Sequence, residues 1–499
     1  MECNTGWQGK RDCCKERTMS NGLPDYIAAA RPNPPDNRAP WYKNTAPAYA
    51  GIFLWFVFWL GATQAPNAGG VLSHGIWAPI VSLLLAALLC HTFYYVILGI
   101  MGQKTGLPLY IVGTSTFGAT GGFIMPGFLM GVLQFGWLGV NTYFSSDALS
   151  KAIFSSDALS KTIPVNAKII MVVWGAAAAF VGLKGIQYVA RVATYLPLIP
   201  LITLIVLFLA TVGGLGSFDA SEFVALHKTA VPTAPTALSS FGVVAFIVTY
   251  VVGFFATAGA AGVDFGTNSR DERDVHMGGF VGIAVAIIVT AGLATLILAG
   301  AYGKAGIAAV TTEEGKMAMS AYDVIPAVLG TGLSKVVYLL LAIAAFPAAC
   351  FSAFVAANSF KATLPKVNPF VSVGIGAVAA IIIAVMGWAA DLTMVFNIIG
   401  ASFGPICGAM AVDYMLNKCR WAGPRKGFNP AGWLAWGFGF VIGIMPNLGI
   451  PLPMAPVWAM VAGAVVYWIA AKAGMESEPM PFSPETGEVP PRAPEVQVD

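Results

Sequence analysis

Long apolar stretches separated by short polar segments run through most of this 499-residue chain. No Asp, Glu, Lys or Arg occurs in residues 44–103, 105–146 or 427–471. A helix that crosses a bilayer needs about 20 apolar residues, so each of these runs holds one or two spans. The pattern predicts twelve spans, with approximate limits 48–72, 77–101, 121–144, 167–183, 187–212, 238–263, 279–302, 333–357, 368–387, 392–416, 431–449 and 455–471.

Composition agrees with a membrane protein. Only 10% of the residues are charged and 57% are hydrophobic, against about 25% charged in typical soluble domains. The net charge of +3 is too small to indicate a nucleic-acid partner. We expect a polar N-terminal tail (1–47), a twelve-helix membrane domain (48–472) and a disordered, Pro- and Glu-rich C-terminal tail (473–499). The N-terminal tail lacks the apolar core of a secretory signal, and Met19 is a second candidate start.

Loop charges predict the orientation. If the N-terminus is cytoplasmic and twelve spans follow, only seven of the 27 Lys and Arg residues fall on the outer side. Cytoplasmic loops carry the excess of positive charge, so both termini are expected in the cytoplasm and the chain in the cytoplasmic membrane. The seven outer residues are Lys151, Lys161, Lys168, Lys228, Lys304, Lys316 and Lys335.

A tandem copy interrupts the third connection. Residues 144–153 (FSSDALSKAI) are followed by a near-identical segment at 154–163 (FSSDALSKTI). Both copies fall in a predicted external loop, where insertions are tolerated, which favours a duplication without function over a ligand site. The seven cysteines show no spacing typical of a metal site or a disulfide framework.

The third predicted span carries hydrogen-bonding groups beside an indole. Gln134 and Trp137 are three residues apart and share a helix face, and Asn141 follows on nearly the same stripe. An indole offers a flat platform, and a carboxamide offers both a donor and an acceptor. The alternative is that Trp137 packs against lipid or a helix and Gln134 bonds across helices.

The sixth predicted span has aromatic residues next to a run of small residues. Phe254 and Phe255 precede a stretch of small residues with glycines at 259 and 262, Thr257 adds a hydroxyl, and Asp264 ends the span. Unwinding at the glycines would expose backbone groups to a ligand, whereas close helix packing is the alternative. Asp264 is either a coupling acid or part of a solvated cytoplasmic end.

The first span has a matching irregularity at residues 58–70, which contain Gly61, Pro66 and two further glycines. Paired Gly- and Pro-interrupted segments at equivalent positions of two halves indicate an inverted-repeat transporter. Spans 1 and 6 would be equivalent members of two five-helix halves. The site residues then point to a flat, polar, uncharged ring as the substrate.

At these residues the chain resembles the nucleobase–cation symporter-1 family, nearest its bacterial cytosine permease branch. The resemblance covers about residues 45–472. Four motifs in order carry it: Gly102–Leu107 (GQKTGL), Gln134–Val140 (QFGWLGV), Phe255–Gly259 (FATAG) with Asp264, and Gly404–Asn417 (GPICGAMAVDYMLN).

The resemblance implies a LeuT-like five-plus-five inverted repeat with two extra C-terminal helices and alternating access. It implies a base sandwiched between Trp137 and Phe255. Gln134 would bind the edge of the base, with help from groups around Thr257 and Ala258. No cofactor is expected beyond a coupling ion.

The resemblance also implies an ion site. In sodium-coupled relatives, carbonyls near the break in span 1, here about Phe58 to Gly61, join oxygens of span 8. One alignment keeps a single hydroxyl, Ser352, and places Asn358 at a substrate-contacting position. Other expected oxygens are replaced by alanine, so proton coupling through Asp264 rivals Na⁺.

The sequence therefore predicts a secondary active importer of cytosine or a purine. The alternatives are an importer of allantoin, hydantoin or a thiamine-like ring, or a receptor or channel for a nucleobase without coupled uptake. A membrane enzyme is not expected, because the spans hold no convincing His, Cys and acid cluster. The oligomeric state stays open.

Overall fold

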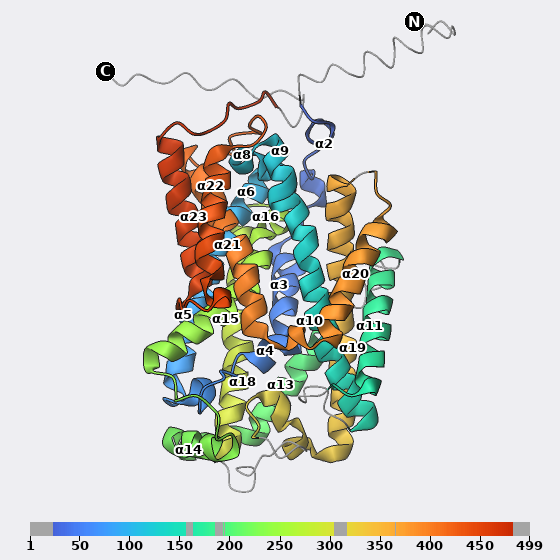
Figure 1. The fold of residues 1–499 in the computed structure, drawn as a ribbon, viewed down its shortest axis with the longest axis vertical. Coiled ribbons are helices and arrows are strands. Elements are labelled where there is room, and N and C mark those ends of the chain that lie inside the picture. The colour runs from blue at the N-terminus through green and yellow to red at the C-terminus, as the bar shows by residue number, and fades with distance from the viewer. Residues whose placement is uncertain are drawn as a thin grey trace, which may run out of the picture.

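The computed structural model describes residues 23–155, 163–184, 193, 195–303, 317–364 and 366–482. This part of the chain is built from helices, and its extended segments pair only in two isolated bridges. The long helices lie alongside one another between two ends of the molecule (Figure 1). We call these the α2 end, where α2 (Asp25–Ala28) lies, and the α14 end, where α14 (Ala220–Ala230) lies.

The membrane spans follow the predicted pattern. Ten described segments are long and apolar enough to cross a bilayer, and the predicted spans 48–72 and 368–387 correspond to shorter apolar helices. An all-α membrane protein is therefore confirmed. Residues 187–192 and 194 of the predicted fifth span lie outside the described part. The principal helices are α3 (Thr45–Leu54), α4 (Phe56–Gly61), α5 (Trp77–Leu89), α6 (Ile97–Thr105), α10 (Leu129–Phe154), α11 (Val165–Lys184), α13 (Leu198–Thr211), α15 (Ser240–Ala260), α16 (Gly262–Gly266), α17 (Glu272–Gly279), α18 (Ala286–Gly303), α19 (Ala321–Thr363), α20 (Pro369–Val385), α21 (Leu392–Leu416), α22 (Pro430–Ile444) and α23 (Ala455–Lys472).

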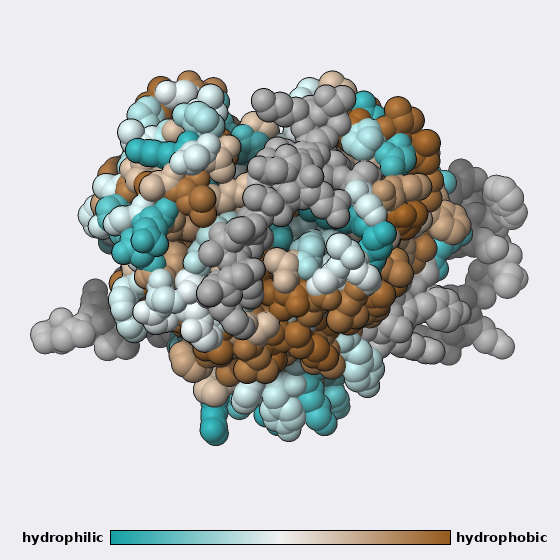
Figure 2. Space-filling view, turned by 90° about the horizontal axis from the view of Figure 1, so that it is seen from below, coloured by the Kyte–Doolittle hydropathy of each residue, from teal (hydrophilic) through white to brown (hydrophobic). Residues whose placement is uncertain are grey.

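Apolar side chains cover the outward faces of the spans. Leu88 of α5, Val173 of α11, Leu209 of α13 and Ile375 of α20 are 48%, 63%, 67% and 70% exposed. Seen from the α14 end, hydrophobic residues gather in broad areas along the flanks, with hydrophilic residues between them (Figure 2). Soluble monomers rarely expose contiguous apolar surface on this scale, so these faces fit a lipid environment.

The first span is interrupted at Trp55. This residue has φ −57° and ψ 126°, outside the helical region, and it separates α3 from α4. The break expected at about Phe58 to Gly61 was therefore placed too late, since both residues lie inside α4. The irregularity predicted at residues 58–70 is present as well, because α4 ends at Gly61 and residues 62–69 are not helical. Trp55 is neither Gly nor Pro, so the sequence carries no local mark of the break.

The sixth span is interrupted only slightly. Ala261, between α15 and α16, keeps helical torsion angles (φ −63°, ψ −6°). The predicted unwinding of the glycine stretch is thus limited to one residue. Gly259 and Gly262 instead let α15 and α16 approach Tyr94 and Tyr95, because an added Cβ would meet their atoms at 2.9 Å and 3.0 Å. The alternative of close packing through small residues fits this geometry.

The first tandem copy is helical, contrary to the loop expected from the sequence. Residues 144–153 belong to α10, which extends to Phe154, and Asp147 is fully buried there. Its carboxylate accepts a hydrogen bond from the Tyr322 hydroxyl at 2.9 Å and pairs with Lys151 at 3.3 Å. These partners allow a charged residue to sit in the helix interior. Residues 156–162 of the second copy lie outside the described part.

The C-terminal tail is ordered at its start. Met480 and Phe482 are buried, at 8% and 2% exposure, and the Phe482 ring lies 5.8 Å from that of Trp421. The expectation of disorder from residue 473 is therefore wrong for residues 473–482. Residues 483–499 lie outside the described part.

Gly102 provides a test of the packing. An alanine Cβ at this position would clash with the Val263 carbonyl where α6 crosses α16. We expect Gly102→Ala to destabilise the protein by about 1–3 kcal/mol, the usual cost of overpacking, measured as a lower thermal unfolding midpoint in detergent. Gly374→Ala is the control, because a Cβ there meets nothing within 4 Å. Equal midpoints for both variants would contradict this packing.

Candidate functional site

An aromatic cluster lies where the break in span 1 meets three other helices. The Trp137 ring of α10 lies 6.0 Å from Trp55, 5.0 Å from Phe254 of α15 and 5.5 Å from Phe396 of α21, measured between ring centroids. Trp137 itself is only partly buried. The cluster therefore presents neutral, flat surfaces at the meeting point of four segments that are distant in sequence.

One hydrogen bond joins two predicted site residues across helices. The Trp137 indole Nε1 donates to Thr257 Oγ1 at 3.0 Å, and Thr257 is 4% exposed. Burial without this bond would leave both groups unpaired at a cost of about 1–3 kcal/mol each. The bond thus fixes the orientation of the indole against α15.

Gln134 lies one turn before Trp137 and is partly exposed. Its Nε2 donates to Met130 Sδ at 3.6 Å within the same helix. A thioether is a weak acceptor, whereas a carboxamide has two N–H donors and an acceptor oxygen. One N–H donor and the acceptor oxygen of the Gln134 carboxamide are therefore available to bind the edge of a ligand.

Phe255 does not face Trp137. Its ring is fully buried and stacks on Phe53 at 5.6 Å. The neighbouring Phe254 is the ring against Trp137, so the structure does not bring together the predicted sandwich of Trp137 and Phe255. The Ala258 carbonyl accepts a hydrogen bond from the Tyr49 hydroxyl at 3.0 Å.

The two predicted asparagines lie in different surroundings. Asn141 is buried, donates from Nδ2 to the Ala345 carbonyl at 3.0 Å, and accepts from Trp174 Nε1 at 3.2 Å. These contacts hold α10 against α19 and α11, as expected for a packing residue. Asn358 of α19 is exposed.

The predicted ion-coupling residues contact three different groups and do not meet at one point in the hydrogen bonds of the described part. The Phe58 carbonyl accepts from the Tyr250 hydroxyl at 3.1 Å, and a Cβ on Gly61 would clash with that same hydroxyl. Ser352 Oγ donates to the Ala348 carbonyl of its own helix at 3.1 Å. Asp264 Oδ1 accepts from the Leu109 amide at 2.8 Å. In this structure these residues act as packing and capping groups.

Two polar atoms near the aromatic cluster were not singled out from the sequence. Trp55 Nε1 and Asn397 Oδ1 are buried and have no hydrogen-bond partner among the described residues. Asn397 follows Phe396, whose ring contacts Trp137. Unsatisfied buried polar atoms require an explanation, and a ligand is one. An asparagine inside an otherwise apolar span was the available signal.

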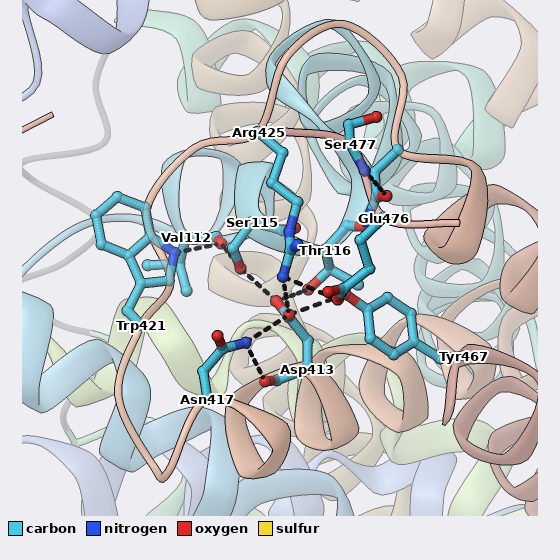
Figure 3. A network of polar contacts seen from close by, with 11 residues as sticks. Val112, Ser115, Thr116, Asp413, Asn417, Trp421, Arg425, Tyr467, Glu476 and Ser477 are labelled. Carbon is cyan, nitrogen blue, oxygen red and sulfur yellow. Dashed lines mark hydrogen bonds and ion pairs between the residues drawn. The ribbon is translucent and has the colours of Figure 1, made fainter. Parts of the chain in front are cut away.

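A second polar site surrounds Asp413 near the α2 end (Figure 3). This carboxylate is 1% exposed. Its Oδ2 accepts from Ser115 Oγ at 2.6 Å and Thr116 Oγ1 at 3.0 Å, and its Oδ1 accepts from the Tyr467 hydroxyl at 2.9 Å. A buried charge needs such compensation, so Asp413 joins α21 to α23 and to the segment before α10.

Arg425 completes this network. Its Nη2 lies 3.0 Å from Asp413 Oδ1 and 2.9 Å from Glu476 Oε1. Burial alone would lower the pKa of Arg425, but Asp413, Tyr467 and Glu476 together outweigh that effect and raise the pKa, so the guanidinium stays charged. Asp413 lies within the Gly404–Asn417 motif, where the sequence alone assigned it no role. A lone acid late in an apolar span was the signal that was missed.

Asp413→Asn tests this network. The change leaves Arg425 buried with Glu476 as its remaining charged partner, and breaking a buried ion pair costs about 3–5 kcal/mol. We expect a clear drop in the thermal unfolding midpoint, towards the lower part of that range because Glu476 remains.

Asp391→Asn is the matched control for that measurement. Asp391 is exposed and caps the first turn of α21, accepting from the Met394 amide at 2.9 Å, and Asn caps a helix about as well as Asp. Similar midpoints for the two variants would show that the Asp413 network contributes little.

Membrane-length apolar helices with polar and aromatic groups gathered at an internal break are the arrangement expected of a membrane transporter. The chain belongs to the family of permeases for cytosine/purines, uracil, thiamine and allantoin, whose sequence model matches residues 35–470. The protein is therefore a transporter and not an enzyme.

Individual proteins that are similar to this chain are transporters too. The chain is 26% identical over 380 residues to the cytosine permease of Escherichia coli (strain K12), covering 75% of this chain and 79% of the relative. Mhp1, a nucleobase-cation-symport-1 family transporter in a closed conformation with bromovinylhydantoin bound, superposes with a TM-score of 0.58 at 14% identity, over 90% of this chain and 96% of Mhp1.

A further solved structure shares the fold. A Na⁺-coupled sialic acid symporter in a substrate-bound outward-open state gives a TM-score of 0.57 at 12% identity, over 93% of this chain and 94% of the symporter. At such identities these two likenesses concern the fold alone. They confirm the predicted LeuT-like fold.

Proposed function

We propose that this chain imports a nucleobase, cytosine or a related base, across the cytoplasmic membrane by cation-coupled alternating access. The observation that carries the proposal is the cluster around Trp137, in which aromatic faces lie next to the partly exposed carboxamide of Gln134. Membership of the permease family supports the substrate class.

The chemistry of the cluster favours a flat, uncharged ring. Stacking a base on an aromatic side chain contributes about 1–3 kcal/mol in nucleic-acid proteins. The rings of Trp55, Phe254 and Phe396 around Trp137 are all neutral, so a charged substrate would lose its hydration there without gaining a counter-ion. Edge contacts to Gln134 would discriminate between bases, because a missing partner leaves a buried group unpaired.

The orientation is part of the proposal. Basic residues are concentrated on segments at the α2 end, among them Lys104, Arg270, Lys418 and Arg425. Positive charge marks the cytoplasmic side, so we place the α2 end and both termini in the cytoplasm.

Substitution of Trp137 and Gln134 tests the site. Trp137→Ala and Gln134→Ala should each abolish uptake of radiolabelled cytosine into proteoliposomes while leaving the protein in the membrane. The first removes the stacking surface and the second removes the edge contact. Trp458→Ala on α23, where the indole is 48% exposed, is the control and should transport normally.

Two results would refute the assignment. Normal substrate affinity in both variants would place the site elsewhere. Uptake of radiolabelled allantoin, hydantoin or thiamine that unlabelled cytosine does not inhibit would assign the protein another substrate of the same family.

The coupling ion is tested with imposed gradients. If Na⁺ drives uptake through oxygens of spans 1 and 8, an inward Na⁺ gradient should accelerate it and Ser352→Ala should remove the acceleration. Ser334→Ala is the control, because Ser334 makes the same kind of bond within α19, to the Thr331 carbonyl at 3.0 Å.

Two other outcomes would indicate proton coupling or uncoupled transport. Uptake driven only by a pH gradient, and lost in Asp264→Asn, would assign proton coupling. Equilibration that ignores both gradients would contradict coupled transport and favour a channel.

A further inference from the structure

A cavity lies at the α2 end, away from the aromatic cluster. It has a volume of about 500 Å³ and is lined by residues 104–105 at the end of α6, residue 414 of α21 and residues 418–421 after α21. We call it the basic pocket. The proposed transport site uses none of these residues, so the pocket needs its own explanation.

The charges of the pocket favour an anion. Lys418 and Arg420 are exposed and form no ion pair with any described residue. Lys104 lies 3.0 Å from Glu272, but both side chains are largely exposed, at 43% and 53%, where such pairs are weak. Two uncompensated cations and a third that is loosely held thus border one cavity.

A buried tyrosine lines the same cavity. Tyr414 lines the pocket and is 5% exposed. Its hydroxyl lies beside the Lys104 ammonium, within reach of a hydrogen bond from it, and meets no other hydrogen-bonding group within the described part of the chain. An ammonium can only donate to the tyrosine oxygen, so the hydroxyl proton itself has no acceptor there. A ligand with acceptor oxygens would satisfy it.

The backbone of the pocket wall is strained and well held. Lys418 and Cys419 have φ of 57° and 56°, a left-handed conformation that is uncommon outside glycine. The Cys419 amide donates to the Tyr414 carbonyl at 3.0 Å, and Trp421 Nε1 donates to the Val112 carbonyl at 2.9 Å (Figure 3). Strain of this kind persists where the surroundings enforce it, and it clusters at ligand sites.

We propose that the basic pocket binds a phosphate group, either of an anionic phospholipid or of a soluble phosphorylated molecule. Lys and Arg are the usual partners of phosphate oxygens, and basic pockets between helices on the cytoplasmic side bind lipid head groups. An anion held by Lys104 on one side and by Lys418 and Arg420 on the other joins α6 to α21. Its binding therefore stabilises the α2 end. This proposal is independent of the transported substrate.

The test is the thermal unfolding midpoint, Tm, of the purified full chain in detergent. One arm adds phosphatidylglycerol, with phosphatidylcholine as reference. The other adds inorganic phosphate, with chloride at the same ionic strength as reference, because salt screens exposed charges. A shift with phosphatidylglycerol alone assigns a lipid, and a shift with inorganic phosphate assigns a soluble phosphate.

Charge variants locate the effect. In Lys418→Gln with Arg420→Gln, the ligand concentration for half of the Tm shift should rise by roughly tenfold or more, since each cation near an anionic surface contributes substantially. Lys228→Gln with Lys335→Gln removes the same charge from exposed positions on α14 and α19 and should respond as the wild type does.

Tyr414→Phe gives an independent measurement. The hydroxyl contacts only the exposed Lys104, so its removal should change the Tm without ligand little, and it should reduce the shift caused by the ligand. The proposal is overturned if neither ligand shifts the wild-type Tm, or if the pocket variants respond as the control variant does.

Discussion

The interruption of the first span at Trp55 is the feature on which the central site depends. Membrane-buried backbone that leaves the helix must be packed within protein or line a cavity. Rings from α10 and α15 pack against Trp55, and Phe396 of α21 adds to the same cluster. The bond from Trp137 to Thr257 fixes the central ring. The contacts that cover the broken backbone therefore also form the aromatic faces that a flat substrate needs.

Charged side chains gather at the α2 end and not at the aromatic cluster. The aromatic cluster is neutral, whereas the α2 end holds a compensated carboxylate and the cations of the basic pocket, of which only Lys104 has an acidic partner among the described residues. Asp413 and Tyr414 are neighbours in α21, yet Asp413 is enclosed by donors while Tyr414 borders the basic pocket. Burying charge is costly unless it is paired, so the end of α21 is held firmly on one side and open to an anion on the other.

The sequence predicted the spans because long apolar runs are a strong signal, and it predicted the neighbourhood of Trp137 and Thr257. It missed the break at Trp55, because Gly and Pro directed attention to residues 58–70. The residue pattern named both Phe254 and Phe255, and the family resemblance implied Phe255. Adjacent residues point about 100° apart around a helix, and only tertiary packing shows that Phe254 is the one that meets Trp137. The partners of Asp413 lie on segments distant in the chain, which no local pattern reveals.

The measurement that tests the central claim most directly is an experimental structure of the purified protein with cytosine bound. The account predicts the base against the Trp137 indole, with a polar edge within hydrogen-bond distance of the Gln134 carboxamide. Cytosine bound away from the cluster of Trp55, Trp137, Phe254 and Phe396 would contradict it.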